Sequence, residues 1–161
     1  MFNYKALLGV VMSMGLIGCQ TFYSAFPPST TMNFRIANDI NPDSDGRASP
    51  VIVNVYELAS KTVFENQDFF ALYDNASETL RTDLIKKDEL VFEPGARLEY
   101  EMFLQPTTKA VAILVAYRDV EGARWHAVID ADPTGYDDAY VYIDKLAVYI
   151  RDRDTEAATK R

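Results

Sequence analysis

The stretch Val51-Ile52-Val53-Asn54-Val55-Tyr56-Glu57-Leu58 is the clearest strand signal in the chain. It is rich in β-branched and aromatic residues, which fit a pleated, half-buried surface, and it follows a polar segment that ends at Pro50. Upstream, Met32, Phe34 and Ile36 alternate with polar residues, which is the period of a strand with one buried face. Both stretches predict β structure.

The second half of the chain continues this pattern. The run 109–117 is nearly all apolar, which is typical of a central strand covered on both faces. A Pro94-Gly95 pair and Gly122 mark turns. Seven or eight strands with little helix predict a mainly β domain, a two-sheet sandwich over residues 31–150. Besides 109–117, later strands are expected at residues 90–92, 98–104, 125–129 and 139–150, the last as one strand or two.

Residues 62–84 interrupt the strand pattern. Apolar residues there, among them Phe64 and Phe69, recur at spacings that fit helices. Asn66 or the Gln67-Asp68 pair could cap a first short helix, and Asn75 could begin a second. We expect two short helices inserted between strands, with their aromatic side chains packed on a face or an edge of a sheet.

The N-terminus carries an export signal. Lys5 is followed by a mainly apolar run at residues 6–17, which is too short to span a bilayer. An ordinary cleavage site wants a small residue three positions before the cut, where this chain has Leu16. The sequence Leu16-Ile17-Gly18-Cys19 instead resembles the bacterial lipobox, in which the cysteine takes a diacylglyceryl group and becomes the acylated N-terminus.

Cys19 is the only cysteine of the chain, so it has no partner for an internal disulfide. A single cysteine in an exported protein makes most sense if its sulfur is consumed chemically. We therefore predict a lipoprotein signal peptide at residues 1–18, an acylated N-terminus and tether at 19–30, and a charged tail at 151–161. By resemblance to sorted bacterial lipoproteins, a residue other than Asp after the cysteine favours the outer membrane, and here it is Gln20.

Size and charge narrow the possible partners. Residues 19–161 are 143 residues, which is one domain of ordinary size. The net charge is −8, and it becomes −9 when residues 1–18 are removed, because Lys5 is their only charged residue. An acidic surface argues against nucleic acid and anionic headgroups as partners.

The polar segment before the first quoted strand is long, and long loops on a rigid β scaffold often carry binding function. Asn41, Asp43 and Asp45 precede Gly46 at the spacing of a calcium-binding EF-hand loop. The bidentate Glu of that loop should then fall at position 52, which is Ile52. A solvated loop with Asx-turn chemistry is the alternative to an ion site, and the sequence leaves open whether an ion binds.

The chain offers little for catalysis. The only histidine is His126, which we expect on the surface or on an edge strand, without a second metal ligand or a thiol beside it. The pairs Asp130/Asp132 and Asp137/Asp138 could serve a glycosidase, but they read better as solvated turn acids. Nucleotide-binding and hydrolase motifs are missing. Apart from the ion left open at the Asp43–Asp45 loop, the sequence therefore predicts a protein that is not an enzyme and has no metal or cofactor beyond the lipid on Cys19.

The order of these features resembles the TssJ family, outer-membrane lipoproteins of the bacterial type VI secretion system. The resemblance covers nearly the whole of residues 19–161. It is carried by the lipobox, the loop before Pro50, the run 50–58, Phe64, Asp68-Phe69-Phe70, Leu72, Leu80, Pro94-Gly95, Tyr117-Arg118-Asp119 and Trp125. Glu57 departs from the glutamine expected before Leu58.

The resemblance implies a transthyretin-like β-sandwich with an added helical piece, anchored in the outer membrane and facing the periplasm. It implies that the loop 40–49 binds the periplasmic region of TssM, an inner-membrane protein that works with TssL, and that no nucleic acid or small-molecule substrate is bound. The partner-binding residues would be Asn41, Pro42, Asp43, Asp45, Gly46 and Arg47, of which Asn41, Gly46 and Arg47 best match the family. The alternatives are a lipoprotein that binds a sugar or another small ligand through its loops, and a periplasmic enzyme using Asp130 or Asp132.

Overall fold

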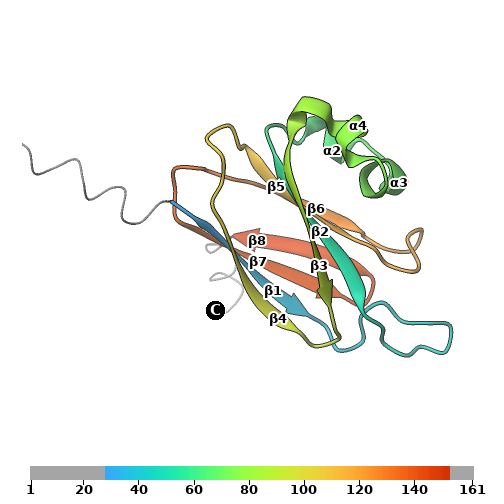
Figure 1. Ribbon diagram of the computed structural model, residues 1–161. Helices are drawn as coiled ribbons and strands as arrows, with labels where there is room; N and C mark the ends of the chain where they lie inside the picture. The colour runs from blue at the N-terminus through green and yellow to red at the C-terminus, as the bar shows by residue number, and fades with distance from the viewer. Residues whose placement is uncertain (1–27, 153–161) are drawn as a thin grey trace, which may run out of the picture.

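The computed structural model describes residues 28–152, which form two four-stranded sheets packed face to face (Figure 1). The strand orders are β4-β1-β7-β8 in one sheet and β3-β2-β5-β6 in the other. The predicted mainly β, two-sheet sandwich is therefore confirmed. The strands are β1 (Thr30–Ile36), β2 (Val51–Leu58), β3 (Leu84–Phe92), β4 (Arg97–Met102), β5 (Ala110–Val115), β6 (His126–Asp130), β7 (Asp137–Asp144) and β8 (Ala147–Asp152).

The pleat of β1 and β2 explains the core between the sheets. Met32 and Phe34 on β1 are buried at alternate positions, as predicted, and they face the odd-numbered valines of β2. The even-numbered Tyr56 and Leu58 point to the opposite face of their sheet, where the helical insert covers them. Because β2 and β5 are covered on both sides, they read as nearly continuous apolar runs, and all six residues of β5 are buried.

The helical insert contains more helices than the two predicted. It comprises α2 (Thr62–Glu65), α3 (Phe69–Tyr73), α4 (Ala76–Leu80) and a 3₁₀ turn η1 (Arg81–Asp83). Asp68 caps α3, with its carboxylate accepting a hydrogen bond from the Ala71 N–H at 3.0 Å. Asn75 precedes α4 as expected, whereas Asn66 ends α2 instead of capping a following helix. The additional helix forms because Phe64 anchors one turn of chain in the cluster under the insert.

Several strand limits differ from the sequence-based expectation. β3 begins at Leu84, six residues before the predicted start, because it is an edge strand whose polar side chains conceal the alternation. The segment 139–150 is divided into β7 and β8, and β8 continues to Asp152. β1 begins at Thr30, within the predicted tether. The predicted signal peptide at residues 1–18, Cys19 and residues 153–161 lie outside the described residues.

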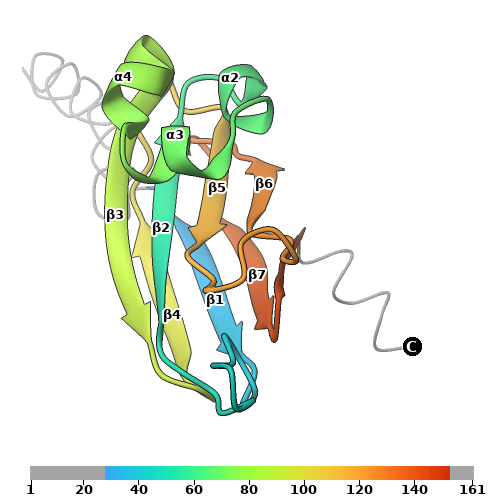
Figure 2. The ribbon, with the colours of Figure 1, turned by 90° about the vertical axis from the view of Figure 1, so that its right-hand side faces the viewer.

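The two flanks of the sandwich differ. On one flank, β6 and β8 approach each other, and Arg124 exchanges backbone hydrogen bonds with Leu146 and Val148 at 2.9 Å each. On the other, β3 and β4 are the edge strands of their sheets. β1 enters at one end, and the loop that follows it protrudes at the far end, at the bottom of Figure 2. Among residues 28–152, the helices are all too short or too polar to cross a membrane.

Candidate functional site

Asn41 fastens the base of the loop between β1 and β2. Its backbone N–H donates to the Lys145 carbonyl at 3.1 Å, and its side-chain Nδ2 donates to the Pro50 carbonyl at 2.8 Å. Its Oδ1 accepts a hydrogen bond from the Arg118 N–H at 2.8 Å. The residue has a positive φ of 48°, a conformation that asparagine tolerates better than most residues. The side chain is 4% exposed, so Asn41 is a structural support within the loop.

Beyond Asn41, a tight turn projects into solvent. The Gly46 N–H donates to the Asp43 carbonyl and the Asp43 N–H donates to the Arg47 carbonyl, both at 2.9 Å. Gly46 has φ 78°, a left-handed conformation that glycine adopts at no steric cost. The Asp43 Oδ1 accepts hydrogen bonds from the N–H groups of Asp45 and Arg47, which is the expected Asx-turn chemistry.

Arg47 is the main charged group at the tip of this turn. Its Nε lies 2.9 Å from Asp43 Oδ2 and its second terminal nitrogen lies 3.1 Å from Asp45 Oδ2. The Arg47 side chain is nevertheless 76% exposed, because both contacts use one side of the guanidinium. The hydrogen bond from the Arg47 backbone N–H, supported by its side chain, lowers the pKa of Asp43 against a smaller opposing effect of burial. The turn therefore presents a fixed, planar donor group next to the carboxyl groups of Asp43 and Asp45.

The same contacts bear on the calcium alternative. The Asp43 carboxylate is engaged by two backbone N–H groups and by Arg47, and Ile52 lies within β2. Within residues 28–152, acidic, cysteine and histidine side chains nowhere form a group of three that could hold a metal ion. A cation in this turn would have to displace the Arg47 guanidinium.

The other candidates from the sequence do not assemble a catalytic site. His126 lies half-buried on the edge strand β6, with ring centroids 4.2 Å from Trp125 and 6.0 Å from Phe64. Burial, followed by the charge of Arg124, lowers the pKa of His126. Asp130 forms an ion pair with Lys61 at 2.5 Å, and Asp132 accepts hydrogen bonds from the N–H and hydroxyl of Thr134.

The structure does bring three of these acids together. Asp130, Asp137 and Asp138 line one cleft of about 520 Å³ at the end of the sandwich where β1 begins, and Thr30 lines it too. The strands β1 and β7 pair there, with Thr30 opposite Asp137. In Figure 1 the start of β1 and the loop between β1 and β2 lie at opposite ends of the sandwich. The cleft lined by Thr30 is therefore at the end opposite to the Asn41–Arg47 turn.

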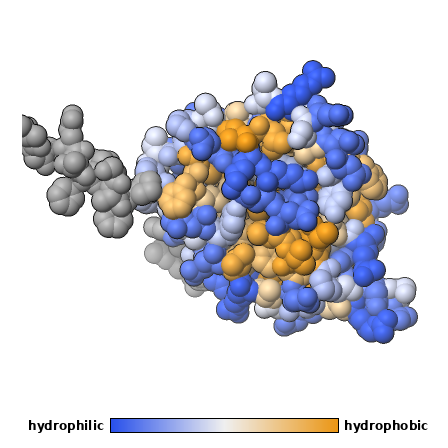
Figure 3. All heavy atoms as spheres, viewed as in Figure 1, coloured by the Kyte–Doolittle hydropathy of each residue, from blue (hydrophilic) through white to orange (hydrophobic). Residues whose placement is uncertain are grey.

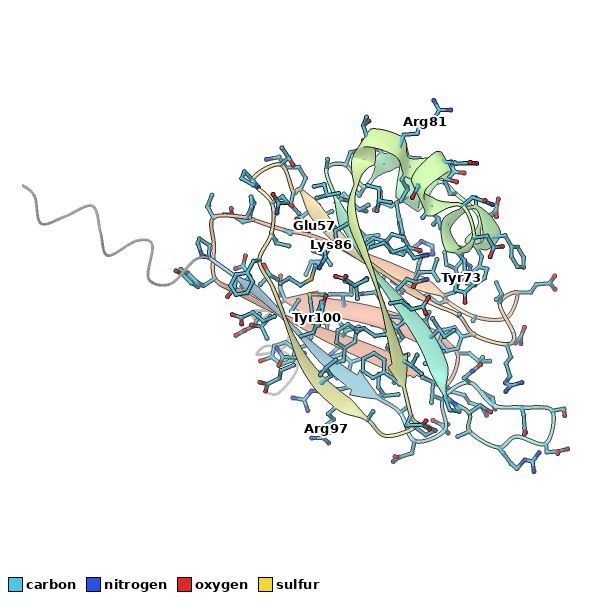
Figure 4. The ribbon with its side chains drawn as sticks, in the orientation of Figure 1. Glu57, Tyr73, Arg81, Lys86, Arg97 and Tyr100 are labelled. Carbon is cyan, nitrogen blue, oxygen red and sulfur yellow. The ribbon has the colours of Figure 1, made fainter. Side chains whose placement is uncertain are left out.

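A second group of polar residues, along the flank between β3 and β4, is not evident from the sequence. Glu57, Lys86 and Tyr100 line a groove of about 570 Å³ there (Figure 4). Lys86 and the Tyr100 hydroxyl both contact Asp88, at 2.6 Å. Burial and the hydrogen bond to Asp88 raise the pKa of Tyr100 to about 12. On the face seen in Figure 3, hydrophobic side chains gather over β3 and β4, where Val91 and Leu98 are exposed.

Glu57 is the residue of this flank that a period-two pattern could have identified. It follows Val51, Val53 and Val55 at the inward-facing positions of β2, where a fourth apolar residue is expected. The carboxylate is 3% exposed. Its Oε1 accepts hydrogen bonds from the Gln105 N–H at 2.6 Å and from the Thr108 hydroxyl at 2.5 Å. Glu57 therefore holds the loop that joins β4 and β5.

Comparisons with known proteins place this geometry in a family. Residues 28–148 match the family model described as "Type VI secretion lipoprotein, VasD, EvfM, TssJ". The crystal structure of the type VI secretion lipoprotein TssJ1 from Pseudomonas aeruginosa is 32% identical, with a TM-score of 0.76, over 80% of this chain and 98% of that chain. No curated protein sequence matches the chain.

Two further solved structures share the fold at lower identity. A chain of a type VI membrane complex is 20% identical, with a TM-score of 0.69, over 78% of this chain and 99% of that chain. A chain in a structure described as the TssM C-terminal domain from EAEC is 19% identical, with a TM-score of 0.65, over 76% of this chain and 97% of that one. The family match and the TssJ1 likeness together decide the assignment. The chain belongs to the type VI secretion lipoprotein family that includes VasD, EvfM and TssJ, which are structural components of a membrane complex and not enzymes.

Proposed function

We propose that this lipoprotein is anchored in the outer membrane through acyl chains on Cys19 and docks the periplasmic region of TssM there, and TssL indirectly through TssM. The observation that carries the proposal is the turn at Asp43–Arg47, which projects at the end of the sandwich opposite to the start of β1. Family membership supports the membrane complex as its setting. The matching chain in the TssM C-terminal domain structure supports TssM as the partner.

The proposed work is mechanical. Residues 1–18 act as a signal peptide that is removed, and residues 19–29 connect the lipid to β1. Several acyl chains, at about 0.8 kcal/mol for each buried methylene, hold a protein on a bilayer stably. The loop at the far end grips TssM on the periplasmic side. The rigid sandwich between these two attachments then connects the outer membrane to TssM, a protein of the inner membrane. This role requires no catalytic turnover.

Within the loop, we assign different tasks to the predicted residues. Arg47 and Asp45 face solvent, so they contact TssM directly, the guanidinium as a planar donor. Gly46 and Pro42 shape the turn between them. Asn41 and Asp43 use their side chains for hydrogen bonds within the protein, so they hold the turn in its binding conformation.

Binding measurements with matched arginine variants test the docking. Arg47→Ala should weaken binding to the TssM periplasmic region by about tenfold or more, which is roughly 1.4 kcal/mol. Arg81→Ala, at an exposed arginine of the helical insert (Figure 4), is the control and should bind as the unaltered protein does. Equal affinities of the two variants for the TssM periplasmic region would show that Arg47 does not contribute to binding.

The anchor is tested separately. Mass spectrometry of the protein extracted from cells should find an N-terminal, acylated Cys19. Cys19→Ser should leave the outer-membrane fraction while the soluble protein still binds TssM. Retention of Cys19→Ser in that fraction would contradict the lipid attachment without bearing on the loop.

A further inference from the structure

The loop between β4 and β5 differs in composition from the rest of the molecule. A quarter of the chain is charged, yet residues 103–108, Phe-Leu-Gln-Pro-Thr-Thr, contain no charged side chain. Phe103 begins the loop and is 57% exposed. The seventh and last residue of the loop is the exposed Lys109, so Phe103 stands at the uncharged end of the loop. An exposed phenylalanine among uncharged residues is costly in water and suits a surface that receives apolar groups.

The loop lies beside the point where the tether joins the domain. Thr30, the first residue of β1, pairs with Met102, and Phe103 follows Met102 directly. On its other side, Thr30 pairs with Asp137 of β7, and the residue before Asp137 is the exposed Tyr136. Cys19 precedes Thr30 by eleven residues. A fully extended segment of that length spans at most about 40 Å. The loop is therefore within reach of any bilayer that holds the acyl chains.

The loop is also held in place from within. Besides the two hydrogen bonds to Glu57 Oε1, the Thr108 N–H donates to the Gln105 carbonyl at 2.9 Å. Glu57 has no cation within 4 Å among the described residues, so these hydrogen bonds are what offset the burial of its carboxyl group. The hydrogen bonds to Glu57 therefore restrict the conformation of the loop, and with it the position of Phe103.

We propose that the loop 103–108 is a second membrane contact, in which Phe103 enters the headgroup region of a zwitterionic phospholipid bilayer beside the lipid anchor. The proposal rests on the anchor at Cys19 proposed above. Aromatic side chains partition into this interfacial region. Glu101 and Asp137 are exposed next to the same edge, and their charges keep the remainder of that edge in water.

This contact gives the domain an orientation that a tether alone does not give. With two attachments at the β1 end, rotation of the sandwich on its tether is restricted. The Asn41–Arg47 turn, at the opposite end, then points away from the bilayer and toward the periplasmic partner. Glu57 is a positioning residue in this arrangement, since it acts through the loop.

Fluorescence of the full lipidated chain reconstituted into phosphatidylcholine vesicles tests the proposal. Phe103→Trp and Phe70→Trp place an indole at two exposed positions, the second on α3 as the matched control. The native Trp125 contributes the same background to both. With brominated acyl chains in the vesicles, Phe103→Trp should show a blue-shifted emission that bromine quenches, and Phe70→Trp should show neither effect.

The role of Glu57 has its own readout. Added to Phe103→Trp, the change Glu57→Ala should reduce the quenching, and Glu57→Gln, which keeps an oxygen acceptor, should restore it. Phe103→Trp emission that is unquenched in vesicles holding the lipidated protein would overturn the membrane contact while leaving the anchor standing. Crosslinking of position 103 to a protein in cells would overturn it as well. A protein that fails to insert into vesicles at all would contradict the anchor itself.

Discussion

The side chain of Asn41 and the backbone N–H of Arg118 are joined by a hydrogen bond of 2.8 Å, although 77 residues separate them in the chain. This contact connects the loop after β1 to the segment after β5. The loop conformation is therefore set by the tertiary structure as well as by its own turn residues.

Replacing Asn41 should destabilise the whole domain. Asn41→Ala leaves the Pro50 carbonyl and the Arg118 N–H without their partner, and we expect the free energy of unfolding to fall by about 2–3 kcal/mol. Asn41→Gly removes the same hydrogen bonds but relieves the positive φ, so it should be about 1 kcal/mol less damaging than Asn41→Ala. Urea unfolding measures both, with the exposed Asn75→Ala as control. Equal stability of all three variants would contradict the role given to Asn41.

The turn should loosen at acid pH. The pKa of Asp43 is lowered from 3.8 in the folded state, so the contribution of its carboxylate is complete above that value and is lost as pH falls through the lower folded pKa. The Arg47 amide signal, followed by NMR, should therefore titrate below pH 3.8, and Asp43→Asn should abolish this titration. A midpoint at or above 3.8 would show that the hydrogen bonds of Asp43 do not favour its ionised form.

Removing the Glu57 carboxylate should release the 103–108 loop. Glu57→Ala leaves the Gln105 N–H and the Thr108 hydroxyl without an acceptor, which should cost about 2–4 kcal/mol of stability. Glu57→Gln should cost roughly 1 kcal/mol or less, because its carbonyl oxygen accepts the same bonds. Hydrogen exchange at the Gln105 amide should be fast in the first variant and slow in the second. Slow exchange in both would show that the loop is held by other contacts.

Two neighbouring phenylalanines of α3 should respond differently to truncation. Phe69 is buried against Tyr73 and Trp125, with ring centroids at 5.2 Å and 5.5 Å, whereas Phe70 is 64% exposed. Phe69→Ala should lower the free energy of unfolding by about 3–5 kcal/mol. Phe70→Ala should change it by about 0.5 kcal/mol or less. A large effect of Phe70→Ala would indicate that the aromatic packing of the insert is different from that described.

The sequence predicts those parts of the fold in which burial alone sets the pattern of apolar and polar residues. β2 and β5 are covered on both faces, so their apolar runs mark them directly. β3 escapes recognition over residues 84–89 because an edge strand carries charges along its length, and Lys86, Lys87, Asp88 and Glu89 conceal its period. The extra helix α2 depends on the burial of Phe64 beneath the insert, which a local pattern of four residues does not reveal.

The candidate site also contains features that local sequence predicts and features that depend on distant residues. The turn at Asp43–Gly46 follows from residues close in sequence, since Asx turns and a left-handed glycine are local chemistry. The internal role of Asn41 is not visible locally, because its partners Lys145 and Arg118 are brought to it by the fold. Glu57 could be noticed as an acid at an inward-facing position, but its partners lie 48 and 51 residues away.

The place of β1 within its sheet determines how the domain would resist a pull between the proposed lipid anchor and the proposed TssM-binding loop. Its seven residues begin at Thr30, after the proposed tether, and end before the loop that leads to β2. β4 pairs with β1 antiparallel on one side, and β7 pairs with it parallel on the other. A force along this strand loads the lateral hydrogen bonds in shear, so that many must rupture together instead of one after another. If the domain connects two membranes as proposed, tension between them would act along the direction in which a β-sheet is mechanically strongest.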